Sequence, residues 1–271
     1  MGELDAYAAA LRAALPPFFS PLEVVERVPT TMARATELAA AAAPEGATVV
    51  AEEQGAGRGR LGRSWVAPRG AALLVSVLLR PALAPADLWL VPSLAGVALV
   101  DAVRELAGSR REHLPAGLKW PNDLLLGGRK AAGLLAEAGT RGGRLAWVAL
   151  GMGVNVNQGL EDFPAEVAGR ATSVALAAGA PVDRAGLLGA WGERFEAGYQ
   201  GLAAGITGPV LAAYRDRLET LGQHVRADRL TGGPVVGTAV EVTARGSLVV
   251  LTGSGARVEV ATADVEHLRP A

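Results

Sequence analysis

The chain of 271 residues contains no cysteine and only three histidines. Without cysteine it can form no disulfide framework, no thiolate metal site and no cysteine nucleophile. His113, His224 and His267 lie far apart in the sequence and show no spacing typical of metal ligands. Aromatic residues make up only 4% of the chain, so leucine and valine are expected to build the core.

The chain also has little net charge and lacks long apolar runs. The net charge is −1, whereas a non-specific nucleic-acid binder is usually strongly basic, so nucleic acid is not expected as a partner. No continuous apolar run reaches the ~20 residues of a membrane span, and the first residues are acidic where a signal peptide is basic. We therefore expect a cytoplasmic protein without a membrane partner.

Two scarce residue types cluster in short segments. Of the 26 basic residues only Lys119 and Lys130 are lysines, and both lie in LKWPNDLLLGGRKAAGLL. The three asparagines are Asn122, in the same segment, and two in GMGVNVNQ. Lysine and arginine differ where a compact, mobile charge is needed, so this clustering indicates a functional site, although drift remains the alternative.

Hydrophobic periodicity and the positions of Gly and Pro predict mixed helices and strands. Thr30 or Thr31 is the expected N-cap of the second helix. Gly127 and Gly128 are expected at the tip of a hairpin, and GMGVNVNQ in a glycine-rich loop after a strand. Helices are expected at 3–15, 32–42, 87–107 and 183–219, and strands at 47–53 and 71–81.

The composition changes near residue 220. The segment that follows contains short alternating runs of Val, Leu and Thr broken by Gly pairs, which is typical of a small all-β barrel or sandwich. We therefore expect two domains, 1–220 and 221–271, joined without a low-complexity linker.

A Gly/Arg loop follows the strand at 47–53. Its pattern Gly57-x-Gly59-x-x-Gly62 matches a dinucleotide fingerprint, but Pro and Gly and then a strand follow where that fingerprint needs a helix. A nicotinamide-binding fold is therefore rejected. The guanidinium groups of this loop suit carboxylate and phosphate oxygens, so it is predicted to bind anions; a solvated turn is the alternative.

Lys119 precedes Trp120-Pro121-Asn122-Asp123 in an apolar segment. A lysine there must meet an anion, either Glu112 or Glu53 of the protein or a bound ligand. A cation between a carboxylate and a nucleoside triphosphate would position both and stabilise charge developing at phosphorus. Asn122 and Asp123 are candidates to orient a base, a ribose or Mg²⁺.

The segment GMGVNVNQ can be interpreted as part of a ligand site or as a bare turn. Gly151 and Gly153 would let the backbone approach a flat ligand, and Asn155 offers an amide donor and acceptor. A bare turn explains the glycines equally well. The rarity of asparagine in this chain favours a functional site.

These motifs in this order, GRGRLGRSW, KWPNDLLL(x)₃KAAGLLAE and GMGVNVN, resemble those of biotin protein ligases over nearly the whole chain. The resemblance implies an α+β fold: a mixed, largely antiparallel sheet with helices, related to class II synthetases and lipoate ligases. A small C-terminal SH3-like β-barrel would follow it. It also implies that biotin is activated with ATP as biotinyl-5′-AMP and transferred to a lysine of a biotin carboxyl carrier domain.

The resemblance assigns residues to the biotin site. Thr30 and Thr31 match hydroxyls that bind the ureido group, and Gln54 matches a glutamine facing the ring. Met32 departs from the family, because asparagine is usual there. The remaining positions assigned to biotin are Arg58, Gly59, Arg60, Lys119, Gly133 and Gly153.

The resemblance also assigns the ATP side and the catalytic groups. Lys119 is the expected catalytic cation between the biotin carboxylate and the α-phosphate, helped by Arg58 and Arg60. No residue is assigned as a certain metal ligand; Mg²⁺ is expected to enter with ATP, with Asp123 as the candidate contact. The positions assigned to ATP are Arg60, Arg63, Trp65, Asn122, Lys130 and Asn155.

Some members of the family carry an N-terminal DNA-binding domain, which needs roughly 60 residues. Only 29 residues precede Thr30, so the form without that domain, and without a repressor role, is expected. The alternatives are a lipoate or octanoyl ligase of the same fold and a non-catalytic biotin-binding module. A homodimer, the carrier's identity and the role of the barrel are left open by the sequence.

Overall fold

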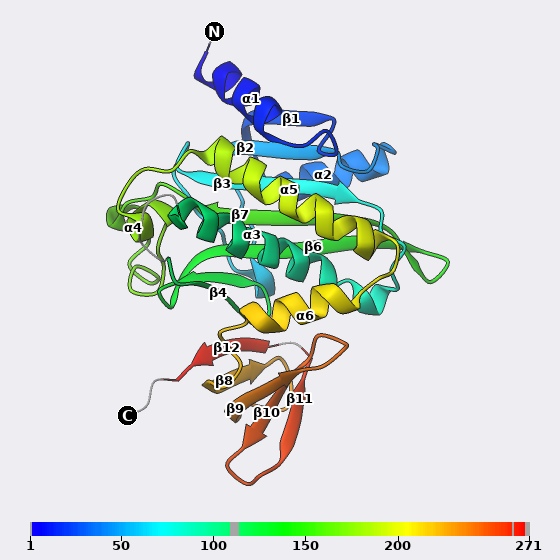
Figure 1. The fold of residues 1–271 in the computed structure, drawn as a ribbon, viewed down its shortest axis with the longest axis vertical. Helices are drawn as coiled ribbons and strands as arrows, with labels where there is room; N and C mark the ends of the chain where they lie inside the picture. Colours follow the sequence, from blue (N-terminus) through cyan, green and yellow to red (C-terminus); the bar gives the residue numbers. More distant parts are fainter. Residues whose placement is uncertain (1, 109–113, 262, 269–271) are drawn as a thin grey trace.

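The computed structural model describes residues 2–108, 114–261 and 263–268, so Glu112 and His113 lie outside the described residues. The chain forms a seven-stranded sheet with helices and, after it, a five-stranded sheet (Figure 1). This arrangement confirms the expected α+β class with a small C-terminal β domain.

The large sheet is mixed and mostly antiparallel. Its strand order is β1-β2-β3-β7-β6-β5-β4; only β1 and β2 pair in parallel, and the other neighbours are antiparallel. The β5–β6 hairpin turns at Gly127 and Gly128, which both have positive φ, as predicted for this Gly pair. The strands are β1 Leu22–Val28, β2 Thr48–Gln54, β3 Ala72–Leu79, β4 Ala116–Lys119, β5 Asp123–Leu126, β6 Arg129–Arg141 and β7 Arg144–Asn155.

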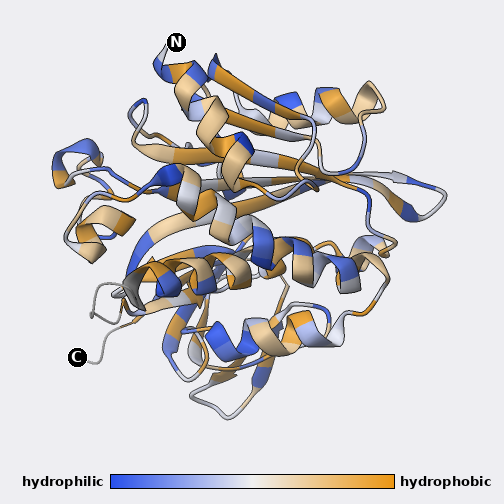
Figure 2. Ribbon diagram, turned by 45° about the horizontal axis from the view of Figure 1, so that its top comes forward, coloured by the Kyte–Doolittle hydropathy of each residue, from blue (hydrophilic) through white to orange (hydrophobic). Residues whose placement is uncertain are grey.

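Most helices cover one face of this sheet, and α2 lies on the other (Figure 1). The apolar strands and the inward sides of these helices form one large core (Figure 2). The helices are α1 Glu3–Ala14, α2 Thr31–Ala40, α3 Leu90–Gly108, α4 Val174–Ala178, α5 Arg184–Ala203 and α6 Gly208–Arg217; short 3₁₀ turns are η1 Arg60–Gly62, η2 Pro85–Asp87 and η3 Leu160–Asp162.

One helical stretch, Pro85–Leu106, has the length and apolar composition of a membrane span, with a mean hydropathy of 1.6. This stretch is not one continuous apolar run, because it includes Asp87, Asp101 and Arg104. Two thirds of its most apolar window is buried, because α3 packs between the sheet and the helices α5 and α6. That position is typical of the core helix of a folded domain.

The second sheet contains β8 His224–Arg229, β9 Val235–Val242, β10 Leu248–Thr252, β11 Arg257–Val260 and β12 Ala263–His267, in the order β11-β10-β9-β8-β12. It lies beside α6 and β4 (Figure 1). Thr220 joins the two parts, since its Oγ1 accepts from the Trp120 amide at 2.9 Å and lies 3.0 Å from His267 Nε2. The Trp120 indole also donates to the Gly246 carbonyl at 2.9 Å.

The structure departs from the predicted elements in three places. β1 was missed, because its charged residues interrupt the apolar pattern of an edge strand. The stretch 183–219 is two helices, broken after Ala203. Gly151 and Gly153 lie inside β7, not in a loop, so the interpretation as a bare turn is wrong.

Candidate active site

The candidate site lies on the face of the large sheet that carries α2. On β7, Met152 and Val154 point into the core, so the alternate residues Gly151 and Gly153 face the opposite side. This face receives the N-terminus of α2 and the loop between β2 and β3. The fold thus brings three sequence motifs, far apart along the chain, to one surface.

Thr30 has a structural role that the sequence predicted. It is the N-cap of α2, and its Oγ1 accepts from the amides of Met32 and Ala33 at 3.1 and 3.3 Å. Thr31, the first helical residue, is also buried. Its amide donates to Gln54 Oε1 at 2.8 Å, so α2 and the end of β2 are joined at the predicted ring-binding residues.

Met32 is 6% exposed and packs on Gly151. A Cβ on Gly151 would lie 2.7 Å from Met32 Cε, which explains why this strand position has no side chain. Met32 forms a small buried cluster with Ala35 and Ala149. A buried apolar thioether therefore stands where the resemblance implies an amide.

Trp65 lies over two of the predicted glycines. A Cβ on Gly153 would be 2.6 Å from the indole, and a Cβ on Gly133 would be 3.2 Å from it. The Lys130 ammonium lies 5.7 Å from the ring centroid, which is within cation–π range. The buried Nε1 of Trp65 has no hydrogen-bond partner among the described residues.

We expect Gly153→Ala to displace the Trp65 ring. Because the added Cβ would overlap the indole, the KM for ATP should rise about tenfold, with a stability cost of about 1–3 kcal/mol. The measurement is initial rate against ATP concentration, with the melting temperature. Gly201→Ala in α5 is the matched control, because its Cβ would meet nothing within 4 Å. An unchanged KM for ATP would exclude this role of Trp65.

The Gly/Arg loop is a small hairpin. The Trp65 amide donates to the Gly57 carbonyl at 2.9 Å, and the Gly59 amide donates to the Arg63 carbonyl at 2.7 Å. A Cβ on Gly57 would lie 2.3 Å from the Trp65 carbonyl oxygen, so only glycine permits this close approach. A strand follows the loop, which confirms that it is not a dinucleotide fingerprint.

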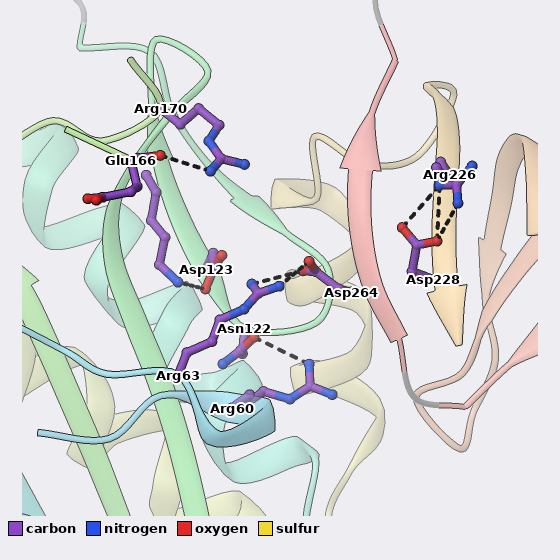
Figure 3. Close-up of polar contacts among 10 residues, drawn as sticks. Arg60, Arg63, Asn122, Asp123, Glu166, Arg170, Arg226, Asp228 and Asp264 are labelled. Atoms are coloured by element: carbon purple, nitrogen blue, oxygen red, sulfur yellow. Dashed lines mark hydrogen bonds and ion pairs between the residues drawn. The ribbon is translucent and has the colours of Figure 1, made fainter. Parts of the chain in front are cut away.

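The three arginines of the loop contact three different parts of the chain: β6, the turn between β4 and β5, and β12. Arg58 Nη1 lies 4.0 Å from Glu137 of β6, and both side chains are largely exposed. Arg60 reaches Asn122 Oδ1 at 3.4 Å (Figure 3). Arg63 forms an ion pair with Asp264 of β12, which joins the loop to the second sheet (Figure 3).

The charge on Arg60 is poorly compensated. Burial lowers its pKa, although Asp123 and Asp264 act in the opposite direction. For Asp264, burial is the largest single influence and would raise the pKa, but the hydrogen bond from Arg63 and the nearby charges of Arg63, Lys119 and Lys130 together lower the pKa below its usual value. Arg60 is thus left with a neutral amide contact, which favours binding of an anionic ligand.

Lys119 ends β4 and is the cross-strand neighbour of Asp123. Asp123 is already paired with Lys130, whose Nζ lies 2.7 Å from its Oδ1. No ion pair to Lys119 exists among the described residues; Glu53 instead pairs with Arg27, and Glu112 lies outside them. Burial lowers the pKa of the Lys119 ammonium, which again favours a bound anion as its partner.

The lowered pKa of Lys119 should change how the reaction rate depends on pH. Because burial lowers the pKa of Lys119, its charge should be lost at lower pH than that of an ordinary lysine, so kcat/KM for acid activation should fall early on the alkaline side. The fall in kcat should come at higher pH, because two bound anions stabilise the ammonium. Initial rates measured between pH 7 and 11, at low and at saturating substrate, give the pH dependence of kcat/KM and of kcat. The same early fall in Lys119→Arg would assign it to another group.

Asn122 and Asn155 differ in their surroundings. Asn122 is half-buried; its amide donates to the Leu134 carbonyl and its oxygen faces Arg60. Asn155 is 5% exposed; its Nδ2 donates to the Thr172 carbonyl at 3.1 Å and its Oδ1 accepts from Gln158. Thr172 in turn donates its amide to the Lys130 carbonyl, so Asn155 supports the segment that positions Lys130.

An open groove of about 600 Å³ runs beneath the loop. It is lined by residues 56–64 of the loop and by Leu135 and Glu137 of β6. No group of three or more carboxylate or histidine side chains within reach of one metal ion occurs in the described part of the chain.

Sequence reasoning missed three residues of this face. Ser76 is the lone polar residue in the apolar strand β3, and that interruption was a readable signal. Glu137 is the last residue of the motif KWPNDLLL(x)₃KAAGLLAE but was assigned no role. Asp264 lies 201 residues from Arg63, and nothing in the sequence indicates their pairing.

The fold is that of protein ligases: the family model described as the biotin/lipoate A/B protein ligase family matches residues 24–155. A second model, described as the biotin protein ligase C-terminal domain, matches residues 220–268. The chain belongs to the biotin protein ligase family.

Individual relatives agree. A biotin–[acetyl-CoA-carboxylase] ligase of Mycobacterium tuberculosis is 38% identical over 251 residues, covering 92% of this chain and 89% of the relative. A bifunctional ligase/repressor of Bacillus subtilis is 36% identical over 238 residues, covering 88% and 71%. The solved biotin protein ligase of Aquifex aeolicus in complex with biotin and ATP has a TM-score of 0.75 and 27% identity, covering 92% of this chain and all of its own.

Proposed function

We propose that this enzyme activates biotin as biotinyl-5′-AMP and transfers the biotinyl group to a lysine of a biotin carboxyl carrier domain of a carboxylase. The observation that carries the proposal is the set of cations left without carboxylate partners on one face of the sheet. Lys119 and Arg60 are both buried enough to lower their pKa values, and a carboxylate and a phosphate would supply the missing charge.

In the first step a biotin carboxylate oxygen attacks the α-phosphorus of ATP, and the bond to the β-phosphate bridging oxygen breaks. Pyrophosphate leaves. We propose that Lys119 lies between the two anionic reactants, so that it reduces their repulsion and stabilises charge at phosphorus. Arg60 and Arg58 would hold the adenylate from the loop side, and Mg²⁺ would enter with the ATP phosphates. Asp123 would act chiefly through its ion pair with Lys130.

In the second step the carrier lysine nitrogen attacks the carbonyl carbon of the adenylate. The carbon–oxygen bond to AMP breaks, and the amine loses a proton. The loop hairpin would exclude water until the carrier arrives, because water would hydrolyse the mixed anhydride.

The two ligands would occupy neighbouring parts of the face. We propose that the ring of biotin binds at Thr31 and Gln54, and that Thr30 acts through its cap. Gly133 and Gly153 would act by making room for the Trp65 ring that lies over them. ATP would bind near Trp65, Lys130 and Arg63. Asn122 and Asn155 would position this part of the site. Gly59, whose amide closes the loop hairpin on the Arg63 carbonyl, would help the loop to cover the ligands.

The proposal also covers the domain boundary, the cellular location and the partners of the enzyme. The domain boundary is placed at 220/221, between α6 and β8. The enzyme is expected to act in the cytoplasm, without nucleic acid or membrane as partner; a homodimer stays a prediction.

The test is biotin-dependent exchange of labelled pyrophosphate into ATP, followed by transfer to a carrier domain. Exchange that needs biotin, and transfer lost when the carrier lysine is changed to arginine, support the proposal. Exchange with lipoate or octanoate in place of biotin would assign the chain to the sister ligases. Biotin binding without exchange would make it a binding module.

A further inference from the structure

A chain of hydrogen bonds runs from β3 through α2 to β2. Ser76 Oγ donates to Thr31 Oγ1 at 2.8 Å, and Thr31 Oγ1 donates to Gln54 Oε1 at 3.2 Å. The Thr31 backbone amide donates to the same Gln54 oxygen at 2.8 Å. These three side chains therefore form one connected relay at the predicted ring-binding end of the site.

The direction of this relay is fixed by a backbone group. A backbone N–H can only donate, so the Gln54 atom that faces it must be the oxygen. The Thr31 hydroxyl then also donates to that oxygen, and its own oxygen accepts from Ser76. The Gln54 Nε2 is consequently turned the other way, toward the loop. A Cβ on Gly57 would lie 3.0 Å from it, and no described residue accepts its protons.

Ser76 is placed to maintain this order. It is completely buried in β3 and is paired across the sheet with Gly151, which has no side chain. A buried hydroxyl is retained at such a position only when it is hydrogen-bonded. By donating to Thr31 it occupies an acceptor site of that hydroxyl and leaves the Thr31 proton to Gln54.

We propose that Ser76 is a positioning residue whose relay through Thr31 holds Gln54 with its amide N–H groups toward the ligand, so that this end of the site takes a ring with an acceptor there, a cyclic urea, and rejects a cyclic guanidinium. The proposal rests on the proposed function and specifies what selects the ring. A urea oxygen accepts from Gln54, whereas a protonated guanidinium presents a donor to a donor.

The first experiment compares biotin with 2-iminobiotin, in which =NH₂⁺ replaces the ring carbonyl at neutral pH. Dissociation constants are measured by calorimetry on the full chain. The wild type should prefer biotin. In Gln54→Glu one carboxylate oxygen keeps the two Thr31 bonds and the other faces the ligand as an acceptor. We expect weaker biotin binding by about tenfold and tighter iminobiotin binding by a similar factor, as for hydrogen bonds to charged groups.

The second experiment tests Ser76 itself. In Ser76→Ala the Thr31 hydroxyl loses its donor, so the dissociation constant for biotin and its KM should rise about fivefold. The KM for ATP and kcat should stay near the wild-type values. Ser93→Ala is the matched control, because it removes another buried serine hydroxyl, bonded to the Trp89 carbonyl of its own helical region.

Different results of these experiments would contradict the Ser76 relay and the proposed function. Equal losses for biotin and iminobiotin in Gln54→Glu would overturn the donor orientation. A biotin KM in Ser76→Ala no higher than in Ser93→Ala would overturn the role of Ser76. A general structural defect would instead change kcat and both KM values together. A wild-type chain that neither binds biotin nor catalyses the exchange would refute the proposed function, and not this inference.

Discussion

Lys119→Ala is expected to reduce biotin-dependent pyrophosphate exchange by a factor of about 10²–10³, while biotin still binds. The physical reason is the loss of one preorganised cation at the atom where charge develops, which typically costs on the order of 3 kcal/mol. Lys119 is suited to this role because burial has already lowered its pKa and no described residue pairs with it. Its electrostatic effect is thus available to the ligands.

The measurement is initial exchange rate against biotin and ATP concentration, with biotin binding measured separately. Lys119→Arg is the first comparison, since it keeps the charge but replaces a compact ammonium by a planar fork; a partial loss is expected. Lys130→Ala is the matched control for the other lysine, and we expect it to raise the KM for ATP. Near-normal exchange in Lys119→Ala would show that another group supplies the charge.

Arg60→Gly is expected to release the adenylate before the carrier arrives. Free biotinyl-5′-AMP acylates any exposed amine, so labelling of a bystander protein should increase at least about tenfold relative to the wild type. Arg60 is half-buried, and its one described hydrogen bond is to the neutral Asn122 side chain. A buried guanidinium in this state gains most from an anionic ligand, so its removal should affect retention of that ligand.

The assay follows biotin on a bystander such as serum albumin, with and without the carrier. Arg69→Gly is the matched control, because Arg69 pairs with Glu26 on β1 and does not face the groove. Asp264→Asn tests the other support of the loop, since it removes the carboxylate that holds Arg63. If label in Arg60→Gly stays confined to the carrier lysine, Arg60 does not retain the adenylate.

Several features of this protein were readable from the sequence. The cap at Thr30, the Gly127-Gly128 hairpin and the small C-terminal β domain all follow from local patterns, and the structure confirms them. Local patterns work here because a cap, a tight turn and strand alternation each depend on residues only a few positions apart. Lys119 and Lys130 were singled out because lysine is rare in this chain.

Other elements were beyond local reasoning. β1 carries charged residues that pair with neighbours on α2 and β2, so its apolar alternation is weak. The pattern RLAWVALGMGVNVN predicted a strand that ends in a glycine-punctuated loop, whereas β7 continues through both glycines to Asn155. The reason for glycine at these two positions lies in the tertiary structure, because Met32 and Trp65 occupy the space above Gly151 and Gly153.

The sequence by itself determined the family and the candidate residues for its chemistry, because that chemistry needs particular side chains in recognisable motifs. The tertiary structure alone decided how those side chains are oriented and paired. The bond from Ser76 to Thr31, the direction of the Gln54 amide and the pairing of Arg63 with Asp264 join segments between 23 and 201 residues apart. Such contacts depend on how the sheet is ordered and how α2 and the C-terminal sheet pack against it, and no local pattern encodes that arrangement.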